Sequence, residues 1–141
     1  MLIGEFITPV GDKNRVAIPK KLRGQLEDDI VITKGYEGCL ILVDKSRWIQ
    51  LISQINKYPL LGMNVRDTKR FLLGGAFDLD IDKQGRFVIP EALVLYGQLA
   101  EEVVFVGVGE WIEVWSNLNW QAKSDYLAKH SADIADRLGQ S

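Results

Sequence analysis

Residue types that build covalent or metal-bound sites are scarce in this 141-residue sequence. Cys39 is the only cysteine, so an internal disulfide is impossible, and we expect a chain that works in the reducing cytoplasm. It lies in an apolar run, where a small buried hydrophobe is expected rather than a nucleophile. His130 is the only histidine, which excludes a metal site built from several histidines.

Long apolar segments are also absent. No run approaches the roughly 20 residues that a membrane-spanning helix requires. Gly4 and Glu5 interrupt the apolar start at once, so we expect no signal peptide and no contact with a membrane. With 47% apolar and 26% charged residues, the composition is that of an ordinary globular protein. The length suits one compact domain, or two small ones that share a core.

The patterns that mark catalytic and phosphate-binding sites are missing as well. No Ser/His/Asp or Cys/His set has a suggestive spacing. The segment Gly107-Val108-Gly109 lacks the lysine and the helix onset that a phosphate-binding loop needs. We therefore expect no enzyme and no cofactor.

Alternating acids at Asp78, Asp80 and Asp82 resemble the start of a calcium-binding loop. Lys83, however, stands where that loop needs glycine, and Ile89 stands where it needs glutamate. We therefore expect no metal here, and the alternation predicts a strand with an acidic solvent face.

What the sequence does have is an uneven distribution of charge. The net charge is −2, yet residues 1–70 hold 12 Lys/Arg against 8 Asp/Glu, and residues 71–141 hold 5 against 11. Within residues 12–23 a single acid, Asp12, accompanies five cations, which are Lys13, Arg15, Lys20, Lys21 and Arg23. A polyanion is therefore expected to meet the first half of the chain and to be repelled by the second.

The sequence also matches itself at an offset of 71 residues. Gly11–Pro19 aligns without gaps with Asp82–Pro90, and Trp48 and Trp120 close the two copies. A repeat of this length indicates a duplicated supersecondary unit, because a solenoid needs at least about three copies.

Each copy predicts a strand, a turn, a second strand and a short helix. Asn14 in the first turn occupies the position that Gly85 has in the second, and both residue types tolerate the left-handed backbone region. Pro19 and Pro90 end the second strand and suit the first turn of a helix. The predicted strands cover residues 4–10, 30–33, 39–43, 75–81, 103–108 and 112–115, with short turn strands that run to Ile18 and Ile89. The predicted short helices cover residues 20–24 and 91–97.

Three longer helices complete the prediction. One runs over about 45–57 on an apolar stripe and ends before Pro59, and a second covers about 65–73. A third follows Trp120 to about residue 138, with a narrow stripe of Leu127, Ile134 and Leu138. The second helix carries Arg66, Lys69 and Arg70 on one face, where they either contact phosphate or only solvate the helix. We expect the four tryptophans and Phe105 in the core or at a subunit interface, not as a stacking platform for single strands.

The turn that carries Lys13 and Arg15 is a plausible probe of a DNA groove. A two-stranded ribbon fits the major groove, where arginine can bond to guanine through two hydrogen bonds and lysine can contact phosphate. The alternative is a solvated hairpin tip. The arginine occupies the same place in both copies, as Arg15 and Arg86, which favours DNA binding.

The whole chain resembles the MraZ family of bacterial regulators, which are built from two AbrB-like units. The resemblance rests on Gly4–Phe6, Asp12–Arg15 with Ile18-Pro19 and Leu22-Arg23, Gly38–Leu40, Asp82–Arg86 with Ile89-Pro90, Val104–Val108 and Glu113–Trp115. The family's turn motif, Asp-x-x-x-Arg, is complete from Asp82 to Arg86. The first copy departs from it, with Gly11 in place of Asp and Asn14 in place of Gly. Either Asp12 takes over the role of the missing carboxylate, or the first turn is looser.

This resemblance implies an α+β fold made of two AbrB-like swapped-hairpin β-barrel halves related by a pseudo-twofold axis, with connecting and C-terminal helices. We expect a first repeat at 1–48, a helical connector at 49–74, a second repeat at 75–120 and a C-terminal helix at 121–141. The resemblance also implies a cytoplasmic, nucleoid-associated transcriptional regulator. It would act as a ring-shaped homo-oligomer on double-stranded promoter DNA with direct repeats, in the division and cell-wall gene cluster.

The two turns are expected to contribute unequally to DNA binding. The acids near Arg86 should weaken its contact with DNA, so Arg86 is expected to matter less than Arg15 and to pair with Asp82. The predicted DNA-binding residues are Lys13, Asn14, Arg15, Lys20, Lys21, Arg23, Lys83 and Arg86, with Arg66, Lys69 and Arg70 as further phosphate contacts. The residues predicted to shape the turns are Asp12, Asp82, Gly85, Pro19 and Pro90.

A different function class stays open. The chain could be a protein-interaction or antitoxin-like ring without direct DNA readout, with Trp111, Trp115 and the C-terminal helix as its binding surface. Such a protein would bind its partner independently of salt and would not shift DNA in a gel.

Overall fold

The two copies of the repeat pair their strands with each other. The computed structural model describes residues 1–27 and 29–140. Its strands are β1 (Leu2–Pro9), β2 (Arg15–Ala17), β3 (Ile30–Lys34), β4 (Leu40–Asp44), β5 (Phe77–Leu79), β6 (Arg86–Val88), β7 (Glu102–Gly109) and β8 (Ile112–Ser116). Its helices are α1 (Lys20–Arg23), α2 (Lys45–Ile55), α3 (Met63–Leu72), α4 (Glu91–Gly97) and α5 (Asn117–Asp136), with 3₁₀ turns η1 (Asp12–Asn14), η2 (Tyr36–Gly38) and η3 (Leu138–Gln140).

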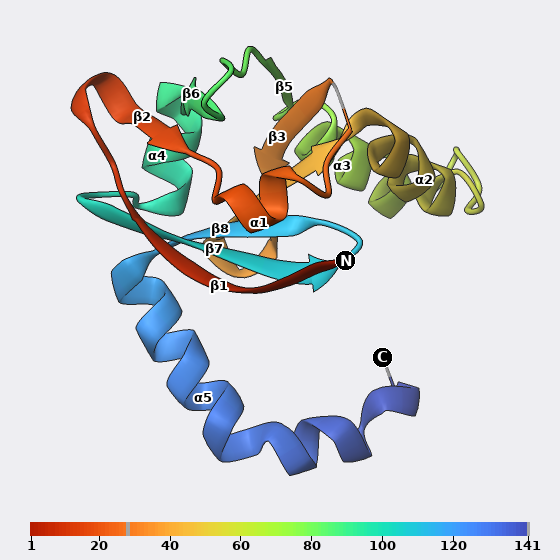
Figure 1. Ribbon diagram of the computed structural model, residues 1–141. Helices are drawn as coiled ribbons and strands as arrows, with labels where there is room; N and C mark the ends of the chain where they lie inside the picture. Colours follow the sequence, from red (N-terminus) through yellow and green to blue (C-terminus); the bar gives the residue numbers. More distant parts are fainter. Residues whose placement is uncertain (28, 141) are drawn as a thin grey trace.

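Six strands form one antiparallel sheet in the order β1-β7-β8-β4-β3-β5 (Figure 1). In the repeat, β5 is the counterpart of β1, β7 of β3 and β8 of β4. The first strand of each copy therefore pairs with the third strand of the other copy, β1 with β7 and β5 with β3. The strand order reads the same after the copies are exchanged, which is the pattern of a pseudo-twofold axis. The structure thus confirms a mixed α+β fold with an antiparallel sheet.

The short strands β2 and β6 form a separate antiparallel ribbon on this axis. Two equivalent hydrogen bonds extend the ribbon beyond the strands. The backbone N–H of Ile18 donates to the carbonyl of Gly85, and that of Ile89 donates to the carbonyl of Asn14, both at 2.9 Å. Each turn is therefore held by backbone atoms of the other copy.

A single core lies between this ribbon and the sheet, and both copies contribute to it. Val16 and Phe87 are directly opposite each other in the ribbon, and both are buried. Their neighbours in the core are also drawn from the two copies and include Leu2, Ile18, Leu22, Ile32, Leu40, Ile89, Leu93 and Phe105. Because the same core holds both copies, we expect neither copy to be stable without the other.

Helices cover the outer face of the sheet. Leu72 of α3 and the half-buried Trp48 and Leu51 of α2 pack against residues of β3 and β4. At the other end, Trp120 of α5 packs against Trp115 of β8, with ring centroids 5.4 Å apart. Figure 1 shows that the rest of α5 leaves the body of the protein. No helix in the described part of the chain is long and apolar enough to cross a membrane.

The ends of several elements differ from the sequence-based expectations by one to four residues, and three of them have a visible cause or consequence. Helix α5 begins at Asn117, before Trp120, because the Ser116 hydroxyl accepts a hydrogen bond from the Asn119 N–H and caps the helix. Strand β5 is limited to residues 77–79. It cannot pair beyond Leu79, which lies opposite Ile30, the first residue of β3, and before it the Ala76 N–H donates to the Leu73 carbonyl in the turn after α3. Helix α2 ends at Ile55, before Pro59 is reached. The proposed divisions at 48/49, 74/75 and 120/121 stay predictions.

Candidate nucleic-acid interface

The outer face of the β2–β6 ribbon carries both turn arginines. Side chains alternate between the two faces of a strand, so burial of Val16 and Phe87 turns their neighbours to the solvent side. Arg15 and Arg86 are both exposed on that side. In the antiparallel register Arg15 pairs with Val88 and Arg86 with Ala17, which places the two arginines diagonally across the ribbon. The pseudo-twofold axis thus presents two guanidinium groups on one small surface.

A hollow of about 680 Å³ lies beside this surface. Its lining includes Lys13 and Arg15 of the first turn, Arg86 of the second and the end of β1 at Thr8 and Pro9. The structure therefore brings together three of the predicted DNA-binding residues, which lie up to 73 positions apart in the sequence. The hollow is open and basic, which suits a polyanion better than a small apolar ligand.

The second turn is braced by the carboxylate of Asp82. One of its oxygens accepts hydrogen bonds from the backbone N–H groups of Gln84 and Arg86, both at 2.9 Å. The other accepts from Nε of Arg86 at 2.8 Å, so the predicted ion pair is present. Hydrogen bonds from the Arg86 amide and from its guanidinium hold the pKa of Asp82 below its ordinary value. Arg86 is thus oriented, and partly neutralised, by its own turn.

The first turn has no such brace. Gly11 stands at the position of Asp82, and in the described residues no side-chain hydrogen bond of Asp12 and no ion pair of Arg15 is found. Lys13 and Asn14 both have a φ of +59°, whereas only Gly85 has a positive φ in the second turn. The left-handed prediction for Asn14 is confirmed, and Lys13 adds a second such residue. In the described residues Asp12 therefore does not take over the role of the missing carboxylate, and the turn is held by backbone hydrogen bonds, such as that from the Gly11 N–H to the Arg15 carbonyl at 2.8 Å.

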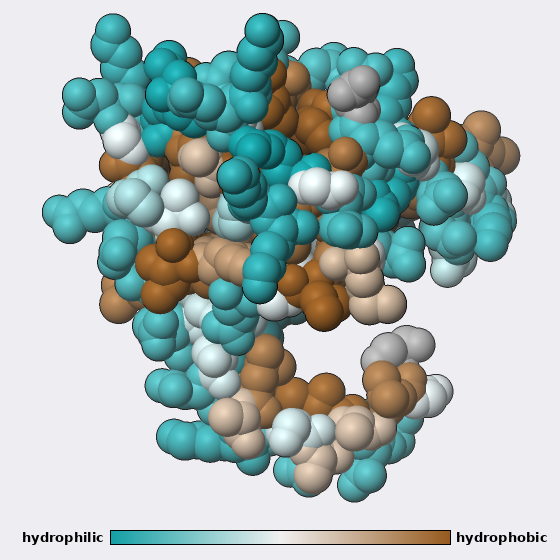
Figure 2. Space-filling view, in the orientation of Figure 1, coloured by the Kyte–Doolittle hydropathy of each residue, from teal (hydrophilic) through white to brown (hydrophobic). Residues whose placement is uncertain are grey.

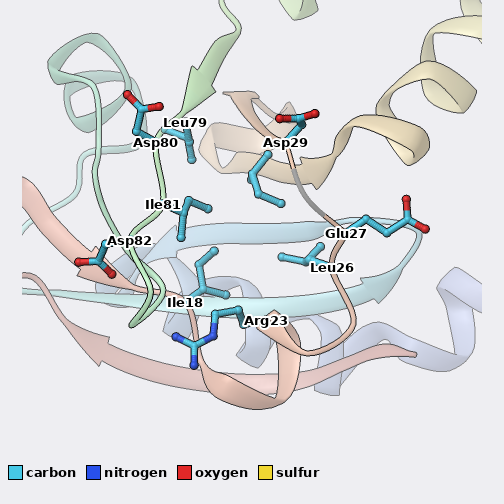
Figure 3. Close-up of a pocket in the computed structure, with 10 residues that line it drawn as sticks. Ile18, Arg23, Leu26, Glu27, Asp29, Leu79, Asp80, Ile81 and Asp82 are labelled. Atoms are coloured by element: carbon cyan, nitrogen blue, oxygen red, sulfur yellow. The ribbon is translucent and has the colours of Figure 1, made fainter.

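Arg23 lies away from the basic hollow. Its side chain packs over the second turn, where a Cβ added to Gly85 would clash with the guanidinium of Arg23. Arg23 also lines a different hollow of about 440 Å³. Figure 3 shows four carboxylates around that hollow, which are those of Glu27, Asp29, Asp80 and Asp82. The surroundings of Arg23 are therefore acidic. Arg15 and Arg86 also line a shallow hollow with Asp80 and Asp82, but Arg15 has no ion pair among the described residues.

The remaining predicted contacts lie elsewhere on the surface. Lys20, Lys21 and Lys83 are exposed, on α1 and at the second turn. On α3, a guanidinium nitrogen of Arg66 donates to the Leu61 carbonyl, and Arg70 pairs with Asp67 at 2.8 Å. Pro19 and Pro90 precede α1 and α4 with nearly the same backbone angles, φ of −53° and −55°. Both copies therefore leave the ribbon in the same way.

Cys39 is buried, as expected. Its thiol donates a hydrogen bond to the carbonyl of Tyr36 at 3.3 Å. Burial, together with the charge of Glu113, raises the pKa of the Cys39 thiol to about 12. The thiolate that a nucleophile requires is thus scarce at neutral pH.

Some residues of this surface were not singled out in the sequence. Thr8, Pro9 and Ala17 line the basic hollow, although none carries a charge. Period-two alternation could have placed Ala17 beside Arg15 on one face. The contribution of β1 could not have been found, because it follows from pairing with the distant strand β7.

Comparison with known proteins places these features in a family. A sequence model described as "MraZ protein, putative antitoxin-like" matches twice, over residues 1–71 and 72–140. A Clostridium acetobutylicum protein named "Transcriptional regulator MraZ" is 38% identical over 140 residues, which are 99% of this chain and 98% of that protein. Proteins of the same name from Leuconostoc citreum and Thermoanaerobacter pseudethanolicus are 38% and 35% identical, over 98% and 99% of this chain and 96% and 98% of theirs.

A solution structure from Pyrococcus horikoshii covers 81% of this chain and 88% of its own. Its sequence identity is 21% and its TM-score is 0.33, which is too weak a likeness to define the fold.

Proposed function

The chain belongs to the MraZ family of transcriptional regulators, and from this premise we propose that it reads double-stranded DNA with the outer face of the β2–β6 ribbon. Its relatives are named as regulators and not as enzymes. The observation that supports the proposal is the pair Arg15 and Arg86, which emerge from equivalent positions onto one solvent face. A two-stranded ribbon fits the major groove, and each guanidinium can donate two hydrogen bonds to one guanine.

The two arginines play different parts. Arg15 is the principal reader, because its guanidinium is exposed and the surrounding cations attract the DNA backbone. Arg86 makes a weaker contact, because its Nε is bound to the carboxylate of Asp82. Asp82, Gly85, Pro19 and Pro90 shape the two turns.

The predicted phosphate contacts are also expected to contribute unequally to DNA binding. Lys13 at the edge of the hollow and the exposed Lys20 and Lys21 contact phosphates beside the reading arginine. Arg23, Arg66 and Arg70 already have other contacts in the structure, so they contribute less to DNA binding. Lys69 and Lys83 contribute only as peripheral charges.

The biological setting is proposed from the family resemblance. The chain would act in the cytoplasm, at the nucleoid, on direct repeats in the promoter of the division and cell-wall gene cluster. The exchange of first strands between the copies is consistent with two swapped-hairpin barrel halves. A single ribbon supplies few contacts, so self-association into a ring would multiply them and would match repeated sites with repeated subunits.

Salt-titrated binding to the chain's own upstream promoter DNA tests this function, with scrambled DNA of equal length as the control. We expect selective binding at moderate salt that weakens by roughly 0.9 log units of affinity per log unit of salt for each phosphate neutralised. The solution mass of the protein should be measured in parallel. Equal affinity for both DNAs at moderate salt would rule out sequence-specific readout.

The alternative is a protein-interaction or antitoxin-like ring without direct DNA readout. It is favoured by an apolar groove of about 580 Å³ between α5 and the sheet, which includes Trp111 and Trp115 in its lining. A protein ligand of that groove should bind with little dependence on salt, because apolar contacts are not screened. The salt titration therefore separates the two candidates.

A further inference from the structure

The β2–β6 ribbon has a hollow on each side, and the pseudo-twofold axis relates the two. The counterpart of the basic hollow has a volume of about 380 Å³. It is lined by Arg15, Asp80, Ile81, Asp82, Arg86, Phe87 and Val88, and we call it the mixed hollow. All of these residues except Ile81 are the repeat equivalents of residues that line the basic hollow. Figure 2 shows that hydrophilic side chains cover the upper left of the molecule, where Figure 1 places this ribbon.

The two hollows differ in charge, although their backbone plan is the same. The basic hollow contains both turn arginines and Lys13, against the single acid Asp12, which gives a net charge of +2. The mixed hollow contains the same two arginines against Asp80 and Asp82, so its charges cancel. The ribbon is therefore basic on one side and neutral on the other.

Asp80 is the acid of the mixed hollow whose charge is not balanced nearby. Asp82 already accepts three hydrogen bonds within its own turn, one of them from Nε of Arg86 at 2.8 Å. Asp80 is exposed, and among the described residues its carboxylate has no ion pair. Figure 3 shows this carboxylate directed away from the apolar side chains of Ile18 and Leu26. The repeat equivalent of Asp80 is Pro9, which has no charge.

This difference matters in a groove of DNA, because the major groove is bounded by two phosphate backbones, one from each strand. A ribbon that lies in the groove turns one of its sides to each backbone. An exposed charge acts over about 8–10 Å at ordinary ionic strength, which is enough to reach the nearest phosphates. The basic hollow should therefore attract the phosphates of one strand, while Asp80 repels those of the other.

We propose that Asp80 is a positioning residue that keeps one of the two DNA backbones away from the ribbon. The ribbon then lies off the centre of the groove, with its phosphate contacts on the strand that faces the basic hollow. A reader with nearly twofold symmetric backbone thereby distinguishes the two strands of its site. This inference rests on the proposed DNA readout and adds a strand preference to it.

The test is phosphate ethylation interference on the chain's own upstream promoter DNA, with each strand end-labelled in turn. The variants are Asp80→Lys and Asp80→Asn, and the control is Asp78→Lys. Asp78 is exposed on β5 and lines neither hollow, so its replacement changes the net charge by the same amount at a different place. Circular dichroism checks that each variant is folded. Asp80→Asn is almost the same size as the native residue and keeps the test available if lysine disturbs the fold.

We expect ethylation to interfere mainly on one strand of each site for the wild type and for Asp78→Lys. For Asp80→Lys it should interfere on both strands, and the salt dependence should become steeper by roughly 0.9 log units for each phosphate gained. Asp80→Asn should bind the promoter about two- to fivefold more tightly than the wild type, with a weaker strand preference. A purely structural role of Asp80 would leave the strand pattern unchanged.

Three results would overturn the assignment. They are equal interference on both strands for the wild type, an unchanged strand pattern in the Asp80 variants, and an equal change in Asp78→Lys, which would point to total charge alone. A failure of the proposed function looks different, because the wild type would then not distinguish promoter from scrambled DNA. Selective binding with equal use of both strands would leave the DNA readout standing and refute only the role of Asp80.

Discussion

The two copies of the repeat share a backbone plan and differ in how their turns are held. In the second turn, the Asp82 carboxylate accepts three hydrogen bonds and fixes Arg86. In the first, Gly11 offers no carboxylate, two successive residues adopt left-handed angles, and Arg15 is exposed. The difference separates two tasks of a turn arginine, holding its own turn and binding DNA, which one arginine cannot perform equally well. An arginine that braces its own turn has fewer donors for DNA, whereas an arginine without a partner needs its turn to be supported from elsewhere.

That support comes from the opposite copy. The Asn14 carbonyl accepts a hydrogen bond from Ile89, and Val16 packs beside Phe87 in the shared core. The two copies thus differ in the residues of their turns, but they should fold and unfold together as one unit.

The largest expected effect is on the free energy of unfolding, and it tests whether the two copies unfold as one unit. Phe87→Ala should lower the free energy of unfolding by about 3–5 kcal/mol, and Val16→Ala by about 2 kcal/mol, because both side chains are buried at the centre of the ribbon. Urea denaturation followed by circular dichroism and by tryptophan fluorescence measures both changes. We expect one transition with coincident midpoints in each variant. Two separated transitions would show that the copies unfold independently.

The next effect concerns the reading arginines. Arg15→Ala should weaken selective DNA binding by about ten- to a hundredfold, which corresponds to the loss of one bidentate contact with a base. Arg86→Ala should cost less, because the DNA loses a contact that Asp82 already weakens. A gel shift at fixed salt compares the two variants, with Lys129→Ala on the exposed part of α5 as a charge-matched control. A larger loss from Arg86→Ala would reverse the assignment.

A smaller effect comes from making the first turn resemble the second. Gly11→Asp restores the missing carboxylate, and the site has room, because the nearest atom to an added Cβ is the Arg15 carbonyl oxygen at 3.4 Å. The new ion pair should hold Arg15 and weaken DNA binding by about fivefold, the equivalent of an exposed pair of about 1 kcal/mol. Gly11→Asn has a similar shape but no charge, and it should leave the affinity near that of the wild type.

The smallest effect is a pH dependence in the second turn. The pKa of Asp82 is lower in the folded chain than its ordinary value of about 3.9, so its ionised form adds stability above about pH 4. That contribution is lost as the pH falls through the lower, folded-state pKa. Asp82→Asn should therefore be less stable than the wild type at pH 7, and the difference should shrink at the acid end of the titration. Denaturation curves at both ends measure it, and a constant difference would contradict the role of the charge.

Local features of the fold could be predicted from the sequence. The repeat, the turn with Asn14, the prolines and the strand segments depend on neighbouring residues, and helix α4 was predicted with its observed ends. The pairing of β2 with β6 could not be predicted, because alternation tells which face of a strand is buried but not which strand lies beside it. The end of β5 at Leu79 has the same origin, since Leu79 lies opposite the first residue of β3.

The candidate site was predictable in its charges but not in its geometry. Arg15 and Lys13 were found from the local excess of cations, and the Arg86–Asp82 pair from the acids that flank the second turn. Arg23 belongs to the same cluster in the sequence, yet it lies over Gly85 in an acidic environment, because α1 crosses to the turn of the other copy. Short-range charge patterns contain no information about such a long-range contact.

The ribbon on the pseudo-twofold axis has one further consequence. Two identical subunits that met there would share every substitution, so a change that improved one turn would alter the other as well. Here the halves are joined in one polypeptide, and dilution cannot separate them. The equivalent positions Gly11 and Asp82 can therefore diverge. A single gene then encodes one turn that is held by a carboxylate and one turn whose arginine is left unpaired.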